Sequence, residues 1–369
     1  MTKSQLVVTR EGHDEGNQPA HHIGPGRSQV GVFDKAYGDQ PVGGSGRAPH
    51  NDEQGNLTQQ CGHAEGKDRG MAMKTSAQGR RVAVCGDDFG MDACIDHAIF
   101  QLLDAGILSA VSCMSGGASF ARHVAQLKAS DTDIGLHLNL SEPLSAADRD
   151  MLPLCALLVR AYAGRLDPQR ISQAIERQLD AFEDEMGQAP HYIDGHQHVH
   201  QLPGVRGPLL QALQRRYPGQ RPWLRLTQPG ALQGLPWAAV AKAHVIAGLG
   251  GHALAGQLCQ QGWPANGRFF GAYGFTGGKR HYATLLHHWL ANALDGDLIM
   301  CHPALPGPVE HGQQRVAEFE VLASAELREW LVGNGLSVTR LSQMIPVNAS
   351  QRSARRLAWD EADRPVISR

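Results

Sequence analysis

Residues 81–105 read RVAVCGDDFGMDACIDHAIFQLLDA, and this stretch holds one complete unit of the pattern from which the fold is inferred. Arg81 to Cys85 is a short Val-rich run, which is typical of a buried parallel strand. Asp92 to Ala105 follows with apolar side chains at helical spacing, so a helix is predicted there. Two carboxylates, Asp87 and Asp88, lie between the strand and the helix.

The same succession of strand, polar turn and helix recurs along the chain. Over about 265 residues, strands alternating with helices favour a parallel α/β fold, either an open doubly wound sheet or a (β/α) barrel. In both folds, ligand sites gather at the carboxyl ends of the strands. Residues 141–168 are predicted to be an irregular excursion, and residues 230–280 mostly helix and loop. The predicted strands are 81–85, 107–114, 133–140, 191–200, 223–227, 297–301 and 336–341, and the predicted helices are 92–105, 119–129, 168–187, 205–217, 282–294 and 318–334.

Residues 191–200, HYIDGHQHVH, carry titratable groups at every second position: Asp194, His196, His198 and His200. In an extended strand these four side chains share one face. Such a face is a poor core surface, because each group needs a polar partner when it is buried. Imidazole is also a common ligand of divalent metals. The stretch therefore indicates either a metal site or a His-rich edge whose imidazoles are satisfied by backbone and solvent.

Three other predicted strands offer polar groups near their ends. Asp87 and Asp88 follow the first, His137 lies in the alternating segment DIGLHLNL (133–140), and His302 follows DLIMC (297–301). Taken alone, the Asp pair could be a solvated turn and His137 a core histidine. Parallel strands bring their carboxyl ends together, so the fold would unite these groups with the His-rich stretch. One carboxylate and two histidines with open positions are a usual arrangement for metal-assisted hydrolysis.

The ends of the chain differ from its middle. Residues 1–78 are rich in Gly, Asn, Gln, His and Asp and have no sustained hydrophobic period, so they are predicted to be disordered. Met71 and Met73 lie just before the first patterned segment, and the upstream residues are alternatively an over-extended reading frame; intact mass of the native protein decides this. Residues 79–346 are predicted to form the folded domain, and 347–369 a polar tail.

Composition narrows the class of protein. A net charge of −2 gives no general reason to expect a nucleic acid or an acidic membrane as partner. We see no secretory signal, and the most apolar window, 238–256, is too interrupted by charged residues and glycines for a membrane span. The number of cysteines is odd and none forms a CxxC pair, which favours reduced thiols in a cytoplasmic protein. Cys301 adjoins a candidate site residue, but nothing in the sequence activates it. The seven cysteines are Cys61, Cys85, Cys94, Cys113, Cys155, Cys259 and Cys301.

Several segments, in this order, resemble the YdjC-like carbohydrate deacetylase family: GDDFGMDACIDHAI, GILSAVSCM, GLHLNLSEPL, HYIDGHQHVHQLPGV, WLRL and IMCHPA. The family includes chitooligosaccharide deacetylases and deacetylases associated with hopanoid biosynthesis. The resemblance covers about residues 81–342. It implies a distorted (β/α) barrel of the polysaccharide-deacetylase type that removes an acetyl group from an N-acetylated amino sugar with the help of Mg²⁺ or Zn²⁺.

The resemblance also implies roles for individual residues. Asp88, His137 and His196 are expected to bind the metal. Asp87 is the expected general base, and His302 the candidate acid that protonates the released amine. The remaining groups are expected to orient the ligands or to face the substrate, and they are Asp194, His198, His200 and Arg225. Arg225 is a candidate partner either of substrate oxygens or of Asp87.

Two other functions stay open at this point. An amidohydrolase-like or phosphoesterase enzyme would use both His196 and His198 as metal ligands. A non-catalytic carbohydrate-binding relative would keep the fold without needing an acid and a base. The N-acetylated sugar is the one partner expected, and the sequence leaves open whether the chain forms a homodimer. Stacking on a sugar is considered for Trp263, Phe269, Phe270 and Tyr273, although aromatic clusters more often serve packing.

Overall fold

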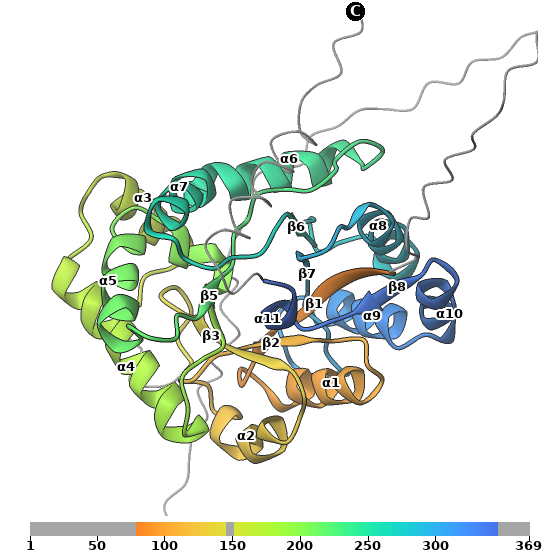
Figure 1. Cartoon of the computed structure of the whole chain (residues 1–369), viewed down its shortest axis with the longest axis horizontal. Helices are drawn as coiled ribbons and strands as arrows, with labels where there is room; N and C mark the ends of the chain where they lie inside the picture. Colours follow the sequence, from red (N-terminus) through yellow and green to blue (C-terminus); the bar gives the residue numbers. More distant parts are fainter. Residues whose placement is uncertain (1–78, 145–150, 346–369) are drawn as a thin grey trace, which may run out of the picture. The chain divides into compact units, whose positions relative to one another are not determined.

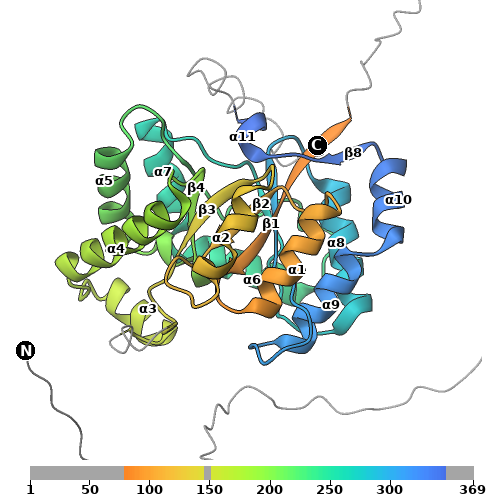
Figure 2. The same cartoon turned by 90° about the horizontal axis from the view of Figure 1, so that it is seen from below.

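A computed structural model describes residues 79–144 and 151–345 of the chain. All strand pairs in the described part are parallel, in one sheet with the order β5-β4-β3-β2-β1-β7-β6, and β8 pairs with β1 off this path (Figures 1 and 2). The helices lie around the outside of the strands. The strands are β1 Arg80–Phe89, β2 Ala110–Cys113, β3 Asp133–Leu138, β4 Tyr192–Gly195, β5 Trp223–Leu224, β6 Phe269–Phe270, β7 Asp297–Cys301 and β8 Leu336–Val338, and the α-helices are α1 Ala93–Asp104, α2 Phe120–Lys128, α3 Leu154–Tyr162, α4 Pro168–Met186, α5 Arg206–Arg216, α6 Trp237–Ile246, α7 His252–Gln261, α8 Gly278–Asn292, α9 Gly312–Leu322, α10 Ala325–Gly333 and α11 Leu341–Met344.

The sheet curls until its two end strands meet. Two isolated parallel bridges, Leu224 to Ala265 and Pro229 to Phe269, join the segment of β5 to that of β6. Closure by single bridges in place of a full ladder makes the barrel distorted. The prediction of a distorted (β/α) barrel is therefore confirmed, and the open doubly wound alternative is wrong.

The strands are buried on both sides, as continuous apolar runs predict. Along β1, Val82 and Val84 belong to the core between sheet and helices, whereas Ala83 and Cys85 belong to a second core that also includes residues of α11. Small residues leave room inside the barrel for a stacked aromatic pair, Tyr192 and Trp223, whose ring centroids are 4.0 Å apart. A Cβ added at Gly135 would lie 2.5 Å from the Tyr192 ring, so this position requires glycine.

Two predicted segments outside the candidate site need correction. Residues 141–168 are not wholly irregular, because Leu154–Tyr162 forms α3, with Leu157 and Ala161 buried. The predicted helix 318–334 is two helices, α9 and α10. Ser324 is the N-cap residue of α10, and its side chain accepts a hydrogen bond from the backbone N–H of Leu327. The predictions for residues 1–78 and 347–369 lie outside the described residues.

Within the described ranges, one helical stretch, Trp237–Gln261, is long and apolar enough to cross a membrane by length and composition. Its mean hydropathy is 1.2, and a third of its most apolar window is buried in the structure. It comprises α6, α7 and the π-helical turn Ala247–Gly251 between them. Gly250, at φ 115°, breaks the regular helix within this stretch.

Candidate metal centre and catalytic site

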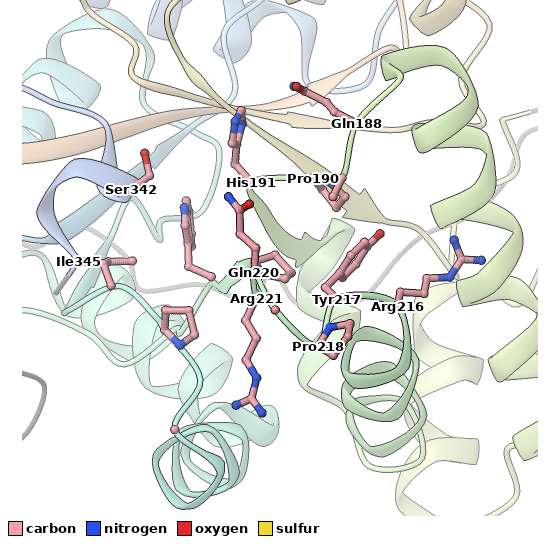
Figure 3. A pocket seen from close by; sticks show the side chains of 16 residues that line it. Gln188, Pro190, His191, Arg216, Tyr217, Pro218, Gln220, Arg221, Ser342 and Ile345 are labelled. Atoms are coloured by element: carbon pink, nitrogen blue, oxygen red, sulfur yellow. The ribbon is translucent and has the colours of Figure 1, made fainter. Parts of the chain in front are cut away.

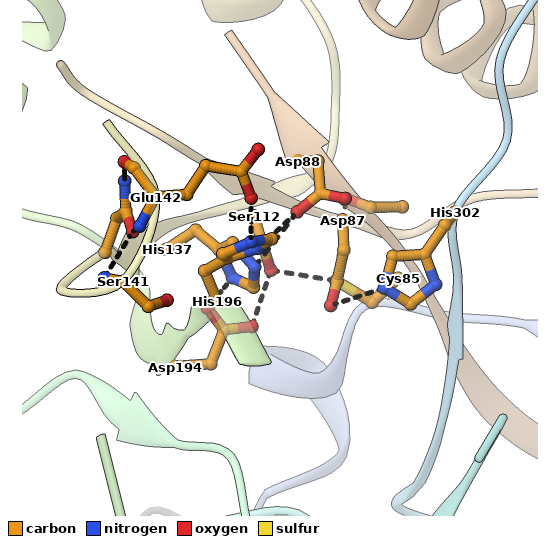
Figure 4. A network of polar contacts seen from close by, with 12 residues as sticks. Cys85, Asp87, Asp88, Ser112, His137, Ser141, Glu142, Asp194, His196 and His302 are labelled. Carbon is orange, nitrogen blue, oxygen red and sulfur yellow. Dashed lines mark hydrogen bonds and ion pairs between the residues drawn. The ribbon is translucent and has the colours of Figure 1, made fainter. Parts of the chain in front are cut away.

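The carboxyl ends of the strands bring the candidate residues together (Figure 4). Asp87 and Asp88 lie at the end of β1, and His137 in β3 is in register with Asp194 in β4. His196 follows β4 directly. Five groups that are far apart in the sequence thus meet at one edge of the barrel, as the parallel fold predicts.

Asp88 is the centre of the cluster. Its Oδ1 atom lies 3.3 Å from Nε2 of His137 and 3.0 Å from Nδ1 of His196. One ligand atom from each of these three buried residues lies within 4.8 Å of the other two. Asp88 has a φ of 71°, which an Asp tolerates but seldom adopts, and such backbone strain is typical of functional sites.

The turn that carries Asp88 is held from α1. The backbone N–H of Gly90 donates to Asp96 Oδ1 at 2.6 Å, and the other oxygen of Asp96 contacts Nδ1 of His123 at 2.7 Å. Burial raises the pKa of Asp96 despite these hydrogen bonds. A Cβ on Gly90, at φ 92°, would lie 2.8 Å from Phe120. The close packing of this turn therefore fixes where the Asp pair points.

The predicted strand 191–200 is wrong in its second half. β4 ends at Gly195, and His196–Gln201 form a 3-10 turn in which Gln197 and His198 are left-handed, at φ 51° and 61°. Two consecutive left-handed residues reverse the direction of the chain, so the four titratable side chains do not share one face. Gly195 permits the reversal, because a Cβ there would lie 2.9 Å from the backbone nitrogen of His200.

Asp194 orients one candidate ligand. Its Oδ1 atom lies 2.6 Å from Nδ1 of His137, and its Oδ2 accepts hydrogen bonds from Ser112 Oγ and contacts Nη2 of Arg225, both at 2.6 Å. A carboxylate only accepts, so Nδ1 of His137 carries the hydrogen and Nε2 faces Asp88. Burial lowers the pKa of His137, but the Asp194 charge outweighs it and raises that pKa to about 10.

His200 and His198 lie apart from the cluster. Nε2 of His200 is 3.0 Å from the carbonyl oxygen of Arg225, and burial lowers the pKa of His200 to about 4. His198 packs edge-on against Phe269, with ring centroids 5.7 Å apart. His198 is also outside the group of described residues that could hold a metal. This placement disfavours a site in which His196 and His198 are both ligands.

Asp87 faces Arg225 and His302. Arg225 donates from Nη1 to Oδ2 of Asp87 at 2.6 Å and from Nη2 to Oδ1 at 2.7 Å. Nε2 of His302 lies 3.9 Å from Oδ2 of Asp87. Burial raises the pKa of Asp87, but the Arg225 charge outweighs it, so the pKa lies below its usual range. Burial lowers the pKa of His302 to about 4.

Two residues of the site were not predicted from the sequence, although one of them, Glu142, lies in the quoted segment GLHLNLSEPL. Glu142 accepts a hydrogen bond from Nε2 of His196 at 3.0 Å, and Arg315 of α9 donates to Oδ2 of Asp88 at 2.6 Å. Glu142 follows β3 in an irregular segment, and Arg315 occupies one of many polar positions before a predicted helix. Burial tends to raise the pKa of Asp88, yet the Arg315 charge and the two imidazoles lower it well below its usual range.

A second cluster of possible metal ligands is already neutralised by the guanidinium of Arg225. One ligand atom from each of Cys85, Asp87 and Asp194 lies within 4.8 Å of the other two. Nη2 of Arg225 contacts all three residues, at 3.0, 2.7 and 2.6 Å. The buried guanidinium supplies the positive charge that these groups need.

No disulfide joins the described cysteines, as the sequence predicts, and Cys61 lies outside the described residues. Burial raises the pKa of Cys301 well above its usual value, and Sγ donates to the carbonyl oxygen of Cys85 at 3.2 Å. A thiol in this state is a poor nucleophile. The aromatic residues considered for sugar stacking are buried packing residues: Trp263 4%, Phe269 3%, Phe270 3% and Tyr273 3% exposed.

A cavity of about 870 Å³ opens at the other end of the barrel (Figure 3). Its lining includes His191 and Trp223, which lie at the amino ends of β4 and β5, and Pro264 before β6. Barrel enzymes place their chemistry at the carboxyl ends of the strands. This cavity is therefore remote from the cluster around Asp88.

The donor set around Asp88 fits a divalent ion. It offers one carboxylate oxygen and two imidazole nitrogens, the combination found in open catalytic zinc sites. His137 and His196 each direct a ring nitrogen at the same oxygen of Asp88, and each has its other ring nitrogen hydrogen-bonded to a carboxylate. Such outer hydrogen bonds fix the ring orientation of metal-binding histidines.

Comparison with known proteins identifies the family of the chain. The model of the YdjC-like protein family matches residues 81–332. Human carbohydrate deacetylase is 29% identical over 298 residues, which cover 72% of this chain and 91% of the human protein. Chitooligosaccharide deacetylase from Yersinia pestis (strain Pestoides F) is 33% identical over 137 residues, or 35% of this chain and 53% of that protein.

A solved structure shares the fold. The crystal structure of an Enterococcus faecalis V583 protein named after cellobiose-phosphate cleavage matches with a TM-score of 0.53 and 18% identity. The match covers 73% of this chain and 100% of that protein. The family match spans more than half of the chain and confirms the resemblance of the sequence motifs. The chain belongs to the YdjC-like family.

Proposed function

We propose that the chain is a metal-dependent hydrolase that removes the acetyl group from an N-acetylated amino sugar, as a chitooligosaccharide or as glycolipid-linked N-acetylglucosamine. The observation that carries the proposal is the meeting of Asp88, His137 and His196 beside the pair Asp87 and His302. The names of the human and Yersinia relatives supply the substrate class.

Asp88, His137 and His196 would hold the ion, which we propose to be Zn²⁺ or Mg²⁺. When bound, such an ion lowers the pKa of water and polarises the amide carbonyl. Asp88 is the better candidate for ligand and Asp87 for base, because Asp88 faces both imidazoles whereas Asp87 faces Arg225 and His302.

Asp87 would accept the proton of the attacking water. Arg225 keeps the carboxylate charged, and its two hydrogen bonds fix the plane of the carboxylate. A buried ionised carboxylate is then ready throughout the neutral pH range, although its low pKa makes it a weak base.

His302 would give a proton to the released amine. Its backbone N–H donates to Glu318 Oε2 at 2.7 Å, which fixes the segment that carries it. Its Nδ1 atom has no hydrogen-bond partner in the described structure. Its imidazole is neutral near pH 7, so it would first take the proton that Asp87 has accepted from water, across the 3.9 Å between Oδ2 and Nε2, and then pass that proton to the leaving nitrogen.

Acetate release tests this function. Purified protein is assayed on N-acetylglucosamine, on its oligomers and on lipid-linked N-acetylglucosamine, with added metal and with a chelator. The proposal expects acetate and a free amine from at least one substrate and loss of both with the chelator. Acetate release that a chelator leaves unchanged would refute the metal dependence. A protein that binds the sugars but releases no acetate would favour the non-catalytic carbohydrate-binding alternative. The cytoplasmic location remains a prediction of the sequence.

A further inference from the structure

Phe275 has an unusual backbone for an aromatic residue. It lies between β6 and α8 with a φ of 54°, in the left-handed region that glycine and asparagine usually occupy. Gly277 and Gly278 also have positive φ, at 94° and 65°, but as glycines they adopt it without strain. Strain of this kind persists only where the surroundings enforce it, and it concentrates at functional sites.

The surroundings of Phe275 are tied to His302. The Phe275 ring stacks on Tyr273, with centroids 5.1 Å apart and planes at 16°. Tyr273 donates from its hydroxyl to Glu318 Oε1 at 2.5 Å, and the other oxygen of Glu318 accepts the backbone N–H of His302 at 2.7 Å. One buried carboxylate thus anchors both the aromatic stack and the candidate acid.

The ring of Phe275 lies directly beside the candidate acid. Its centroid is 4.8 Å from the His302 ring, at 67°, and 5.2 Å from the His311 ring, at 31°. Phe275 is only partly buried, and the His311 side chain is half exposed. Together they form a partly open aromatic surface next to the site, unlike the four buried aromatic residues that the sequence suggested.

We propose that Phe275 is a specificity-determining residue that packs against the pyranose ring bearing the acetamido group. This inference rests on the proposed function. If His302 protonates the amine, the sugar carbon bonded to that nitrogen must lie beside His302, and the sugar ring then meets the neighbouring surface. A pyranose presents C–H groups on its faces and hydroxyls at its rim, so an aromatic face suits it.

Steady-state kinetics on N,N′-diacetylchitobiose test the inference. Phe275→Ala removes the ring, Phe275→Tyr keeps it, and Phe275→Gly removes it while relieving the left-handed backbone. Trp237→Ala is the matched control, because Trp237 is an aromatic residue 82% exposed on α6. We expect the Ala and Gly variants to raise KM about tenfold with kcat within about threefold, and the Tyr variant and the control to resemble wild type.

Saccharide binding, measured by saturation-transfer NMR with the same disaccharide, separates this inference from the proposed function. If the wild-type protein releases acetate and Phe275→Ala has the same KM as wild type, the inference is overturned and the proposed function stands. Binding that needs the Phe275 ring, in a protein that releases no acetate, would support the inference and refute the deacetylase. A wild-type protein that neither binds nor cleaves overturns both. Equal loss of kcat in the Ala, Gly and Tyr variants would show a purely structural role and also overturn the inference.

Discussion

Arg225 and Asp87 form a two-pronged ion pair in the interior of the barrel, with Nη1 and Nη2 at 2.6 and 2.7 Å from the two carboxylate oxygens. Both side chains are at most 1% exposed. Nη2 also reaches Asp194, which orients His137. The same guanidinium therefore connects the proposed base to one proposed metal ligand.

Removing this guanidinium should affect both stability and the pH profile. Arg225→Ala leaves two buried carboxylates without their cation, a loss on the order of 3–5 kcal/mol in the free energy of unfolding. Arg225→Lys keeps a charge but loses the paired geometry and should cost less. Urea unfolding of the three proteins measures the difference.

The pH profile of the Lys variant tests the role of Asp87. Arg225 holds the pKa of Asp87 low, and burial alone would raise it. A base works when deprotonated, so the acid limb of kcat/KM should move to higher pH in Arg225→Lys. An acid limb at the wild-type position, in a folded variant, would contradict the assignment of Asp87 as base.

Metal binding should depend on His137 and His196 but not on His198. His137→Ala and His196→Ala each remove one of three proposed ligands, so the purified proteins should retain little metal by mass spectrometry and show no rise of Tm on adding it. His198→Ala is the matched control, since His198 packs against Phe269 outside the cluster. Metal loss in His198→Ala equal to that in His196→Ala would favour the alternative in which both histidines are ligands.

Glu142 should tune metal affinity without being essential to it. Its carboxylate accepts from Nε2 of His196, and this hydrogen bond lowers the pKa of Glu142. Glu142→Gln keeps the size of the side chain but not its charge, and loss of such a supporting carboxylate weakens metal binding about 10- to 100-fold. Titration of the metal-free protein measures this. Unchanged affinity would mean that the Glu142 contact does not orient the ring.

His302 should matter for turnover more than for binding. Replacing a general acid lowers kcat by roughly 10²- to 10⁴-fold. His302→Gln should show this loss while KM and metal content stay near wild type, since His302 lies outside the proposed ligand set. A parallel loss of bound metal would show that His302 acts through the metal centre and not on the leaving group.

The sequence predicted most of the fold because the strands are continuous apolar runs and the helices keep a regular period. It also predicted the meeting of Asp88, His137 and His196, because parallel strands align their ends. It failed after Gly195, where alternating histidines imitate a strand but two left-handed residues turn the chain. Glu142 and Arg315 were missed for a different reason. Their roles come from contacts with His196 and Asp88, which lie 54 and 227 residues away in the sequence. Hydrophobic periodicity does not predict such distant contacts, and the motif around Glu142 does not show which of its side chains reaches His196.

The buried histidines should make the fold sensitive to mild acid. Burial lowers the pKa of His200 to about 4, below its usual 6.5. Between these two pH values, His200 is neutral in the folded protein and protonated in the unfolded chain. Because the unfolded state binds more protons, this contribution to stability is present above pH 6.5 and is lost as the pH falls toward 4. Between pH 7.5 and pH 5, the loss from His200 is about 2 kcal/mol.

His200→Gln isolates this contribution, because an amide can still donate to the carbonyl oxygen of Arg225, which His200 Nε2 contacts at 3.0 Å, but cannot titrate. Urea unfolding of both proteins at pH 7.5 and pH 5 gives the comparison. From pH 7.5 to pH 5, the free energy of unfolding should fall by about 2 kcal/mol less in the variant than in wild type. An equal loss in the two proteins would place the acid sensitivity in other groups, among which His302, with a pKa also lowered to about 4, is the next to substitute.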